Sequence, residues 1–247
     1  MLEQHVAEGI HRVEDARANW YIVEDGDELT VVDAGLPKSW DSLHSALKAI
    51  GRKPGDIGSI VLTHGHFDHV GFAERARTEL GVPVWAPEGE EFLAAHPWRY
   101  DHERSRLRNA IERPQFIPIF LQMGIAGALW VKGVQQVRSY PHTGSLDVAG
   151  RPEVVFTPGH TSNHCALHFP QRGALIAGDA IVTFDVYTAR GGPQIVSGTA
   201  TADSSKALAS LDALDGTGAQ HVLTGHGPAW TQGVGPAVER ARSTGPH

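Results

Sequence analysis

Apolar and polar positions alternate along most of the chain in short blocks that predict strands and helices in turn. Residues 19–35 have the pattern of two short strands joined by a tight Asp-Gly-Asp turn. Residues 39–51 carry apolar side chains at helical spacing and end at a glycine, where helices commonly stop. Further strands are predicted at 57–66, 82–87, 134–140, 151–159, 164–170, 173–179 and 220–227, and further helices at 70–81, 204–214 and 231–242. Because both kinds of element alternate in both halves, we expect a layered α/β architecture in one domain over residues 1–247.

The middle of the chain, at about residues 88–133, departs from this alternation. Its pattern is helical, but it is broken into pieces by Pro97, Pro114 and Pro118. The stretch 117–130 is more apolar than a helix with one face in water, so it must bury part of its surface. We therefore expect an inserted helical cap that forms one wall of a substrate pocket. The side chains expected to line this wall are Phe116, Phe120 and Met123.

Composition and charge narrow the class of protein. Hydrophobic residues make up 41% of the chain, enough for a core, and the net charge of -7 argues against a nucleic-acid partner. The arginines within 102–113 have two interpretations. They form a solvated helix face, or one of them reaches over the site and holds a substrate carboxylate.

The same features bear on location and partners. No segment has the pattern of a signal peptide or a membrane span, and the single cysteine, Cys165, excludes an internal disulfide. We expect a cytoplasmic protein that acts on a small molecule and has no nucleic-acid or membrane partner. A homo-oligomer stays an open alternative.

Histidine is the most unusual feature of the composition, with 15 in the chain. The stretch "LTHGHFDHVG" places His64, His66, Asp68 and His69 directly after a predicted strand. Residues two apart on an extended segment can point the same way, and the following turn can aim the next two at a neighbouring point. Imidazole and carboxylate are ligands that zinc and similar divalent metals prefer. The motif therefore has a geometry for two metals.

Three more candidate ligands stand at the ends of later predicted strands. They occur in "TPGHTSNH", "IAGD" and "LTGHG", each beside a glycine that allows a sharp turn. A single histidine at such a place is usually structural, but four ordered motifs of this kind are typical of a metal site. The full candidate set is His64, His66, Asp68, His69, His160, Asp179 and His226.

In this order, "THGHFDH", "PGHTSNH", "AGD" and "GHG", with "VVDAG" upstream, resemble the metallo-β-lactamase superfamily over nearly the whole chain. The resemblance implies a four-layer αββα sandwich with a helical insertion and metals at one edge of the two sheets. It implies that the first metal is held by His64, His66 and His160. It implies that the second is held by Asp68, His69 and His226, with Asp179 bridging both. Asp33 would support the site from behind its ligands.

Departures within the family favour its glyoxalase II and lactonase-like branch. An aspartate at the bridging position argues against antibiotic hydrolysis as the main role, because the true β-lactamases usually lack it. His66 argues against the diiron flavoproteins, which carry glutamate there. Lactonases often place a tyrosine just after the bridging aspartate, whereas here Tyr187 follows eight positions later.

We therefore expect a hydrolase of a carbonyl ester, thioester or lactone that uses two zinc ions and a metal-bridging hydroxide. Iron or manganese are the alternative metals. Asp68 would orient the nucleophile, and Tyr187 or His164 would donate a hydrogen bond to the oxyanion. The alternatives are a mononuclear-iron sulfur dioxygenase of the same superfamily, a phosphodiesterase and a non-catalytic metal-stabilised module. The substrate is left open, because specificity lies in loops and in the insertion.

Overall fold

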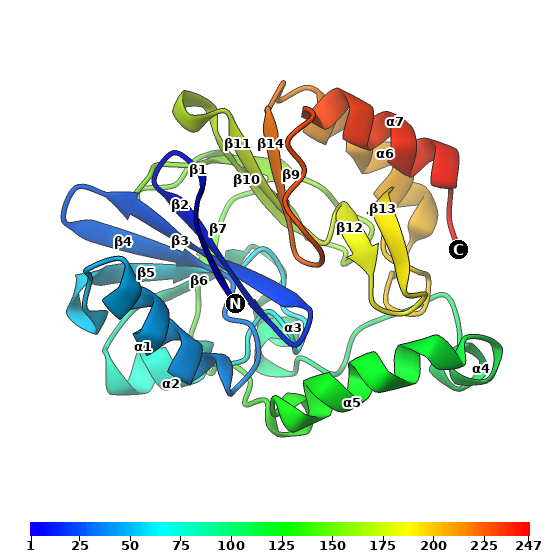
Figure 1. Cartoon of the computed structure of the whole chain (residues 1–247), viewed down its shortest axis with the longest axis horizontal. Helices are drawn as coiled ribbons and strands as arrows, with labels where there is room; N and C mark the ends of the chain where they lie inside the picture. Colours follow the sequence, from blue (N-terminus) through cyan, green and yellow to red (C-terminus); the bar gives the residue numbers. More distant parts are fainter.

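The computed structural model describes all residues, Met1–His247, and shows two β-sheets packed face to face with helices on both outer sides (Figure 1). The chain is thus an αββα sandwich, as predicted, with seven strands in one sheet and five in the other. A separate two-stranded ribbon and a helical segment lie beyond the ends of the sheets.

The first sheet begins as an antiparallel meander and continues as parallel strands. In spatial order its strands are β1 (Leu2–Ala7), β2 (Ile10–Asp15), β3 (Ala18–Asp25), β4 (Glu28–Val32), β5 (Ile57–Val61), β6 (Val84–Pro87) and β7 (Arg138–Tyr140). Helices α1 (Ser39–Ala49) and α2 (Ala73–Glu79) cover its outer face, with a short 3₁₀ turn at Pro54–Asp56. Parallel neighbours require such crossovers, and the apolar stripe of α1 meets Trp20 and Ile22 of the sheet.

The second sheet has the strand order β14-β11-β10-β9-β8. Its strands are β8 (Thr143–Ser145), β9 (Glu153–Phe156), β10 (Cys165–Phe169), β11 (Ala174–Gly178) and β14 (His221–Thr224). A 3₁₀ turn at Pro170–Arg172 joins β10 to β11, and helices α6 (Ser204–Asp215) and α7 (Val234–Thr244) cover the outer face. The ribbon of β12 (Val182–Asp185) and β13 (Arg190–Gln194) follows β11.

Alternating side chains build one core between the sheets and one on each outer side. Along β3, Trp20 and Ile22 face the helices, while Tyr21 and Val23 face the second sheet. Along β10, Leu167 faces inward and Ala166 faces α6 and α7. This period of two is the expected consequence of extended backbone buried on both faces.

Residues 88–133 contain three short helices and two 3₁₀ turns that run along one end of the sandwich (Figure 1). The helices are α3 (Glu91–Ala95), α4 (Arg106–Glu112) and α5 (Ile117–Ile125), with turns at Pro114–Phe116 and Ala128–Trp130. Their inward side chains share a cluster with the loop after β5 and with the ribbon, through Phe67, Met123 and Tyr187.

The sequence pattern located the central strands and the outer helices but not every element. The amino-terminal hairpin β1–β2 and the ribbon β12–β13 were not predicted, and the strand predicted over 57–66 ends at Val61. The remainder of that stretch is the loop that carries His64 and His66. None of the helices is both long and apolar enough to cross a bilayer.

Candidate metal centre

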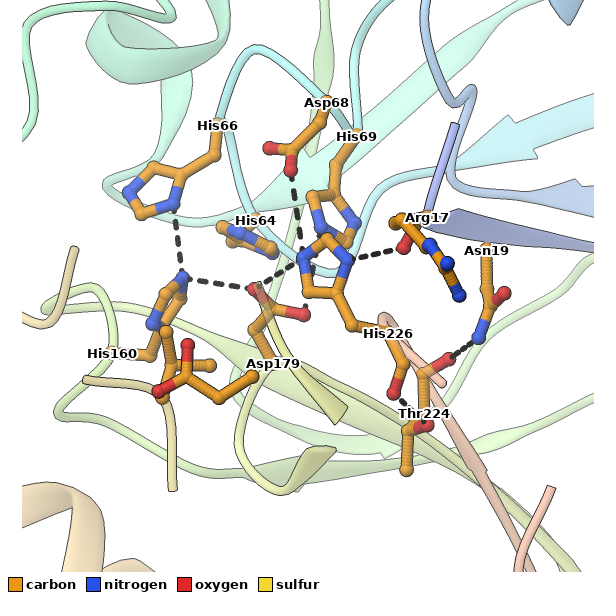
Figure 2. A network of polar contacts seen from close by, with 12 residues as sticks. Arg17, Asn19, His64, His66, Asp68, His69, His160, Asp179, Thr224 and His226 are labelled. Carbon is orange, nitrogen blue, oxygen red and sulfur yellow. Dashed lines mark hydrogen bonds and ion pairs between the residues drawn. The ribbon is translucent and has the colours of Figure 1, made fainter. Parts of the chain in front are cut away.

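The seven predicted ligands meet at one end of the sandwich, although they come from four separate segments (Figure 2). They lie in the loops that follow β5, β9, β11 and β14. Strands β9, β11 and β14 run in the same direction, since β10 is antiparallel to β9 and β11 while β14 is parallel to β11. Their carboxyl ends therefore reach the same edge of the second sheet, and the loop after β5 meets them from the first.

One group of three consists of His64, His66 and His160, whose nearest ring nitrogens all lie within 4.8 Å of one another. Nδ1 of His66 is 2.9 Å from Nε2 of His160. Two unprotonated ring nitrogens at this distance repel each other unless a proton or a cation lies between them. In the metal-free chain the two rings share a hydrogen bond, and a cation can take the place of the shared proton.

A second group of three consists of Asp68, His69 and His226, again with candidate atoms within 4.8 Å. Asp179 lies between the groups: Oδ2 is 3.3 Å from Nε2 of both His160 and His226. Its other oxygen, Oδ1, is 3.6 Å from Nε2 of His69. Because Oδ2 faces nitrogens of both groups and Oδ1 faces the second group, the carboxylate lies where it can bridge two metals.

Several polar atoms at this point are buried and lack a hydrogen-bond partner. Those that face the centre are Nε2 of His64 and His69 and Oδ1 of Asp179. Buried polar atoms are nearly always paired, so three unpaired atoms in one place call for a ligand. A divalent cation fits, because nitrogen and oxygen lone pairs are the atoms left free.

The far sides of the rings are held by acceptors that fix which nitrogen points inward. Nδ1–H of His69 donates to Asp33 at 2.9 Å. Nδ1–H of His226 donates to the carbonyl of Arg17 at 2.7 Å (Figure 2). The ring of His64 donates to the hydroxyl of Thr63, which in turn donates to Asp33. Such partners orient the ligating nitrogen and raise its basicity.

Protonation differs between the two groups in the metal-free chain. Burial, with the neighbouring histidines, lowers the pKa of His64 and His66 well below the usual value, and burial lowers that of His160 to about 4. Burial also opposes protonation of His69 and His226. There, however, the carboxylates outweigh it, Asp179 foremost, and raise the pKa values to about 9 and about 10.

Glycine at 225 is required by the carboxylate that it faces. A Cβ on Gly225 would lie 2.0 Å from Oδ1 of Asp179 and 2.8 Å from a ring carbon of His69. The loop that carries His226 can approach Asp179 this closely only without a side chain there. Asn19 of β3 clamps the same loop by donating to the carbonyls of Thr224 and Gly227, both at 2.7 Å.

His164 holds Asp179 in place and does not face the centre as a donor. Its Nε2 accepts the backbone N–H of Asp179 at 3.1 Å, so Nδ1–H donates to Thr157 at 2.7 Å. Both nitrogens are engaged, which differs from the expectation that His164 stabilises an oxyanion. The physical reason is that the His164 ring packs against the loop of Asp179 and accepts a hydrogen bond from its backbone.

Tyr187, the other expected donor, is buried and reaches the centre through a second tyrosine. Its hydroxyl is 3.1 Å from that of Tyr100, whose ring lies 4.0 Å from the ring of His66. The guanidinium carbon of Arg106 lies over the Tyr100 ring, 4.2 Å from its centre. From the sequence, Tyr100 is one of the aromatic residues expected to pack the inserted helices on the sandwich rather than to bind substrate, because the insertion around it has no motif.

Glu90 is a further residue that the sequence did not indicate. Its buried carboxylate accepts the backbone N–H of Gly65 at 3.0 Å and that of Asn163 at 3.2 Å. It thereby ties the loop of His64 and His66 to the loop of His160. Only the three-dimensional structure brings these loops together, so no sequence signal marks the glutamate.

A groove of about 220 Å³ opens beside His160. Its walls come from residues 89–93 and 99–101 of the insertion and from 160–163 and 202. Of the cap residues expected to line the pocket, Met123 is buried in the core beneath α5, while Phe116 and Phe120 pack near the Tyr187 ring. The start of the insertion, with Phe92, Arg99 and Tyr100, therefore lies nearer the centre than α5 does.

Comparisons with known proteins agree with this geometry. The sequence model of the metallo-β-lactamase superfamily matches residues 14–226. A Bacillus subtilis (strain 168) protein named probable metallo-hydrolase YflN is 27% identical over 230 residues, which are 90% of this chain and 84% of that protein.

Solved structures show the same architecture. The metallo-β-lactamase family protein TTHA1429 from Thermus thermophilus superposes with a TM-score of 0.70 at 24% identity, over 96% of this chain and 79% of that one. TTHA1623, solved in a di-iron-bound form, gives a TM-score of 0.62 at 22% identity, over 93% and 96% of the two chains.

Proposed function

Because this chain belongs to the metallo-β-lactamase superfamily and is a metallo-hydrolase, we propose that it cleaves a carbonyl ester, thioester or lactone with two zinc ions. The observation that carries the proposal is the placement of Asp179 between two three-residue groups, with its Oδ2 3.3 Å from Nε2 of His160 in the first and from Nε2 of His226 in the second. Zinc ions held there would supply Lewis acidity and water of lowered pKa.

The ligand assignment follows the two groups. His64, His66 and His160 would hold one ion, Asp68, His69 and His226 the other, and Asp179 both. Asp68 has a further part, because its Oδ2 lies 3.4 Å from Nε2 of His226 and its carboxylate borders the space between the groups. We assign it the role of orienting the attacking water and accepting its proton.

Tyr100 is the residue best placed to donate to the substrate carbonyl oxygen. It lines the groove beside His160, stacks on His66 and is hydrogen-bonded to Tyr187. Burial keeps the pKa of Tyr100 high, at about 12, so the hydroxyl retains the proton that a donor needs. The predicted role of Tyr187 then becomes that of a partner that orients Tyr100.

The groove favours a small substrate with both an apolar and an anionic or polar part. Phe92 and Leu93 supply apolar surface, and Arg99 supplies a cation that makes no ion pair within the chain. A phosphodiester polymer would need a broad basic surface, which a net charge of -7 does not favour.

The test is metal analysis combined with a substrate panel. The purified chain should contain about two zinc ions and hydrolyse at least one class among short acyl esters, thioesters and lactones. Tyr100→Phe should lower kcat about 100–1,000-fold with little change in metal content, as loss of one oxyanion donor does.

A different result selects the alternative. Iron also occurs in this fold, since TTHA1623 was solved in a di-iron-bound form. One iron per chain, with oxygen-dependent turnover of a persulfide, would establish the mononuclear-iron dioxygenase instead. Two metals without hydrolysis of any carbonyl substrate, but with cleavage of a phosphodiester, would replace the proposed substrate class.

A further inference from the structure

Most of the large hydrophobic side chains that the fold leaves exposed lie on the insertion. Nine are exposed in the whole chain, and seven of them belong to residues 107–130. We call these seven the apolar row: Leu107, Ile111, Ile117, Leu121, Ile125, Leu129 and Trp130, each 44–74% exposed. Helices α4 and α5, which carry five of them, lie along the margin of the molecule, outside both sheets (Figure 1).

Helix α5 is apolar on both its faces. Ile119 and Met123 are buried against the domain, whereas Ile117, Leu121 and Ile125, spaced four apart, point outward. A helix that is hydrophobic all round is normally buried all round. The sequence 114–131 contains no Asp, Glu, Lys or Arg, so no charge interrupts the outer face. Something must cover it.

The size of the apolar row matches half of a stable interface. Six of the seven residues are leucine or isoleucine, which are smaller than the aromatic side chains that present about 150–250 Å², so at these exposures the row leaves roughly 600–800 Å² uncovered. A standard interface buries about 800 Å² on each partner, and the largest apolar patch of a monomer is about 300–600 Å².

We propose that the apolar row is the contact by which two copies of this chain form a two-fold symmetric dimer. A two-fold axis places the same patch on both sides, so the patch must be complementary to itself. The outer face of α5, which carries three of the seven residues, meets this condition, since 114–131 contains no charged residue. The charges of the insertion lie beyond its ends, at Arg106, Arg108, Glu112 and Arg113 around α4 and at Lys132, and Arg108 forms an ion pair with Glu112 at 2.6 Å.

A membrane surface is the less suitable occupant. Helices that lie on membranes usually carry lysine or arginine beside their apolar face, which attracts anionic lipid. Helix α5 has none beside its outer face, the basic residues of the insertion lie beyond its ends at Arg106, Arg108, Arg113 and Lys132, and the chain carries a net charge of -7. Electrostatic attraction of α5 to an anionic bilayer is therefore weak.

Dimerisation would also act on the contact between α5 and the tyrosines near the metal centre. The Phe120 ring on the inner side of α5 lies 5.3 Å from the ring of Tyr187, which bonds Tyr100. A partner on the outer face would press α5 onto these tyrosines.

The test is sedimentation velocity of the metal-loaded full chain between about 1 and 100 µM. The wild-type chain should sediment as a dimer. Leu121→Glu and Ile125→Glu should each weaken dimerisation about 100-fold or more, because the two-fold axis buries two carboxylates per dimer. Ser205→Glu, on exposed α6, is the matched control and should remain dimeric. Circular dichroism should show the same helix content in all variants, since the replaced side chains are exposed in one chain.

Three results would overturn the proposal. A wild-type chain that is monomeric over the whole range has no such interface. A dimer that persists in both glutamate variants uses another surface. Co-sedimentation of the monomer with phosphatidylcholine–phosphatidylglycerol vesicles, lost in Leu121→Glu, would make the row a membrane contact instead.

Discussion

At the scale of single residues, the histidines of the two groups start from different protonation states. In the metal-free chain near neutral pH, His64, His66 and His160 are neutral and ready to bind a cation. His69 and His226 hold protons up to about pH 9 and about pH 10, because Asp179 and its neighbours outweigh burial. A metal in the second group must displace these protons, whereas a metal in the first group displaces none.

Metal loading should therefore occur in two steps that respond differently to pH. Affinity of the second site should rise by up to about 100-fold per pH unit between about pH 6 and pH 8.5, since two protons leave, while that of the first should change little. Zinc titration calorimetry of the metal-free chain at several pH values measures both. Equal pH dependence of the two steps would contradict the assignment of neutral and protonated groups.

Asp68 should be needed for turnover and not for folding. It is buried beside His226 but packs against no apolar cluster, so Asp68→Asn removes a charge without removing volume. The catalytic rate should fall about 100-fold or more, while the circular dichroism spectrum stays unchanged. Asp147→Asn, whose side chain is 95% exposed, serves as the control and should retain full activity. Normal turnover by Asp68→Asn would remove the residue from the catalytic assignment.

At the scale of elements, the sequence predicted what is periodic or chemically distinctive. The strands β5, β10 and β11 and the helices α1 and α6 follow apolar patterns of period 2 or 3.6, and the ligand loops follow strands and contain glycine. The hairpin β1–β2 was missed because its strands carry several polar side chains, such as His5 and Arg12. Glu90 was missed, and Tyr100 was assigned to packing, because their partners at the centre are distant in sequence.

Glu90 tests whether the insertion positions the metal loops. Glu90→Gln keeps one acceptor oxygen but sets an NH₂ group against the backbone N–H of either Gly65 or Asn163. Affinity for the metal held by the first group should fall about 10–100-fold, the usual cost of losing such a supporting contact. The neighbouring Glu91→Gln is the control, since that carboxylate bonds Gly89 and Ser139 away from the centre. Unchanged zinc affinity in Glu90→Gln would mean that the loops hold their positions without it.

At the scale of the whole molecule, the centre joins the two sheets. Each three-residue group combines ligands from the loop after β5 with ligands from loops of the second sheet, and Asp179 contacts both. Without cations, this end of the sandwich contains a cluster of imidazoles, some neutral and some protonated. They lie beside the buried carboxylates of Asp33, Asp68 and Asp179. With cations, the same atoms become ligands that connect the layers, so binding free energy adds to folding free energy.

Removal of the metals should therefore lower the thermal stability of the whole domain. With free zinc at about 1,000 times the dissociation constant, one site adds about 4 kcal/mol, which corresponds to about 8–16 °C in Tm for a chain of this size. Differential scanning calorimetry before and after chelation measures the shift, and re-addition of zinc should restore it. Asp179→Asn, which lacks the charge between the groups, should show a smaller difference between the two states. If chelation removes the zinc and Tm stays the same, the centre does not hold the sheets together, and their apolar interface alone sets the stability of the fold.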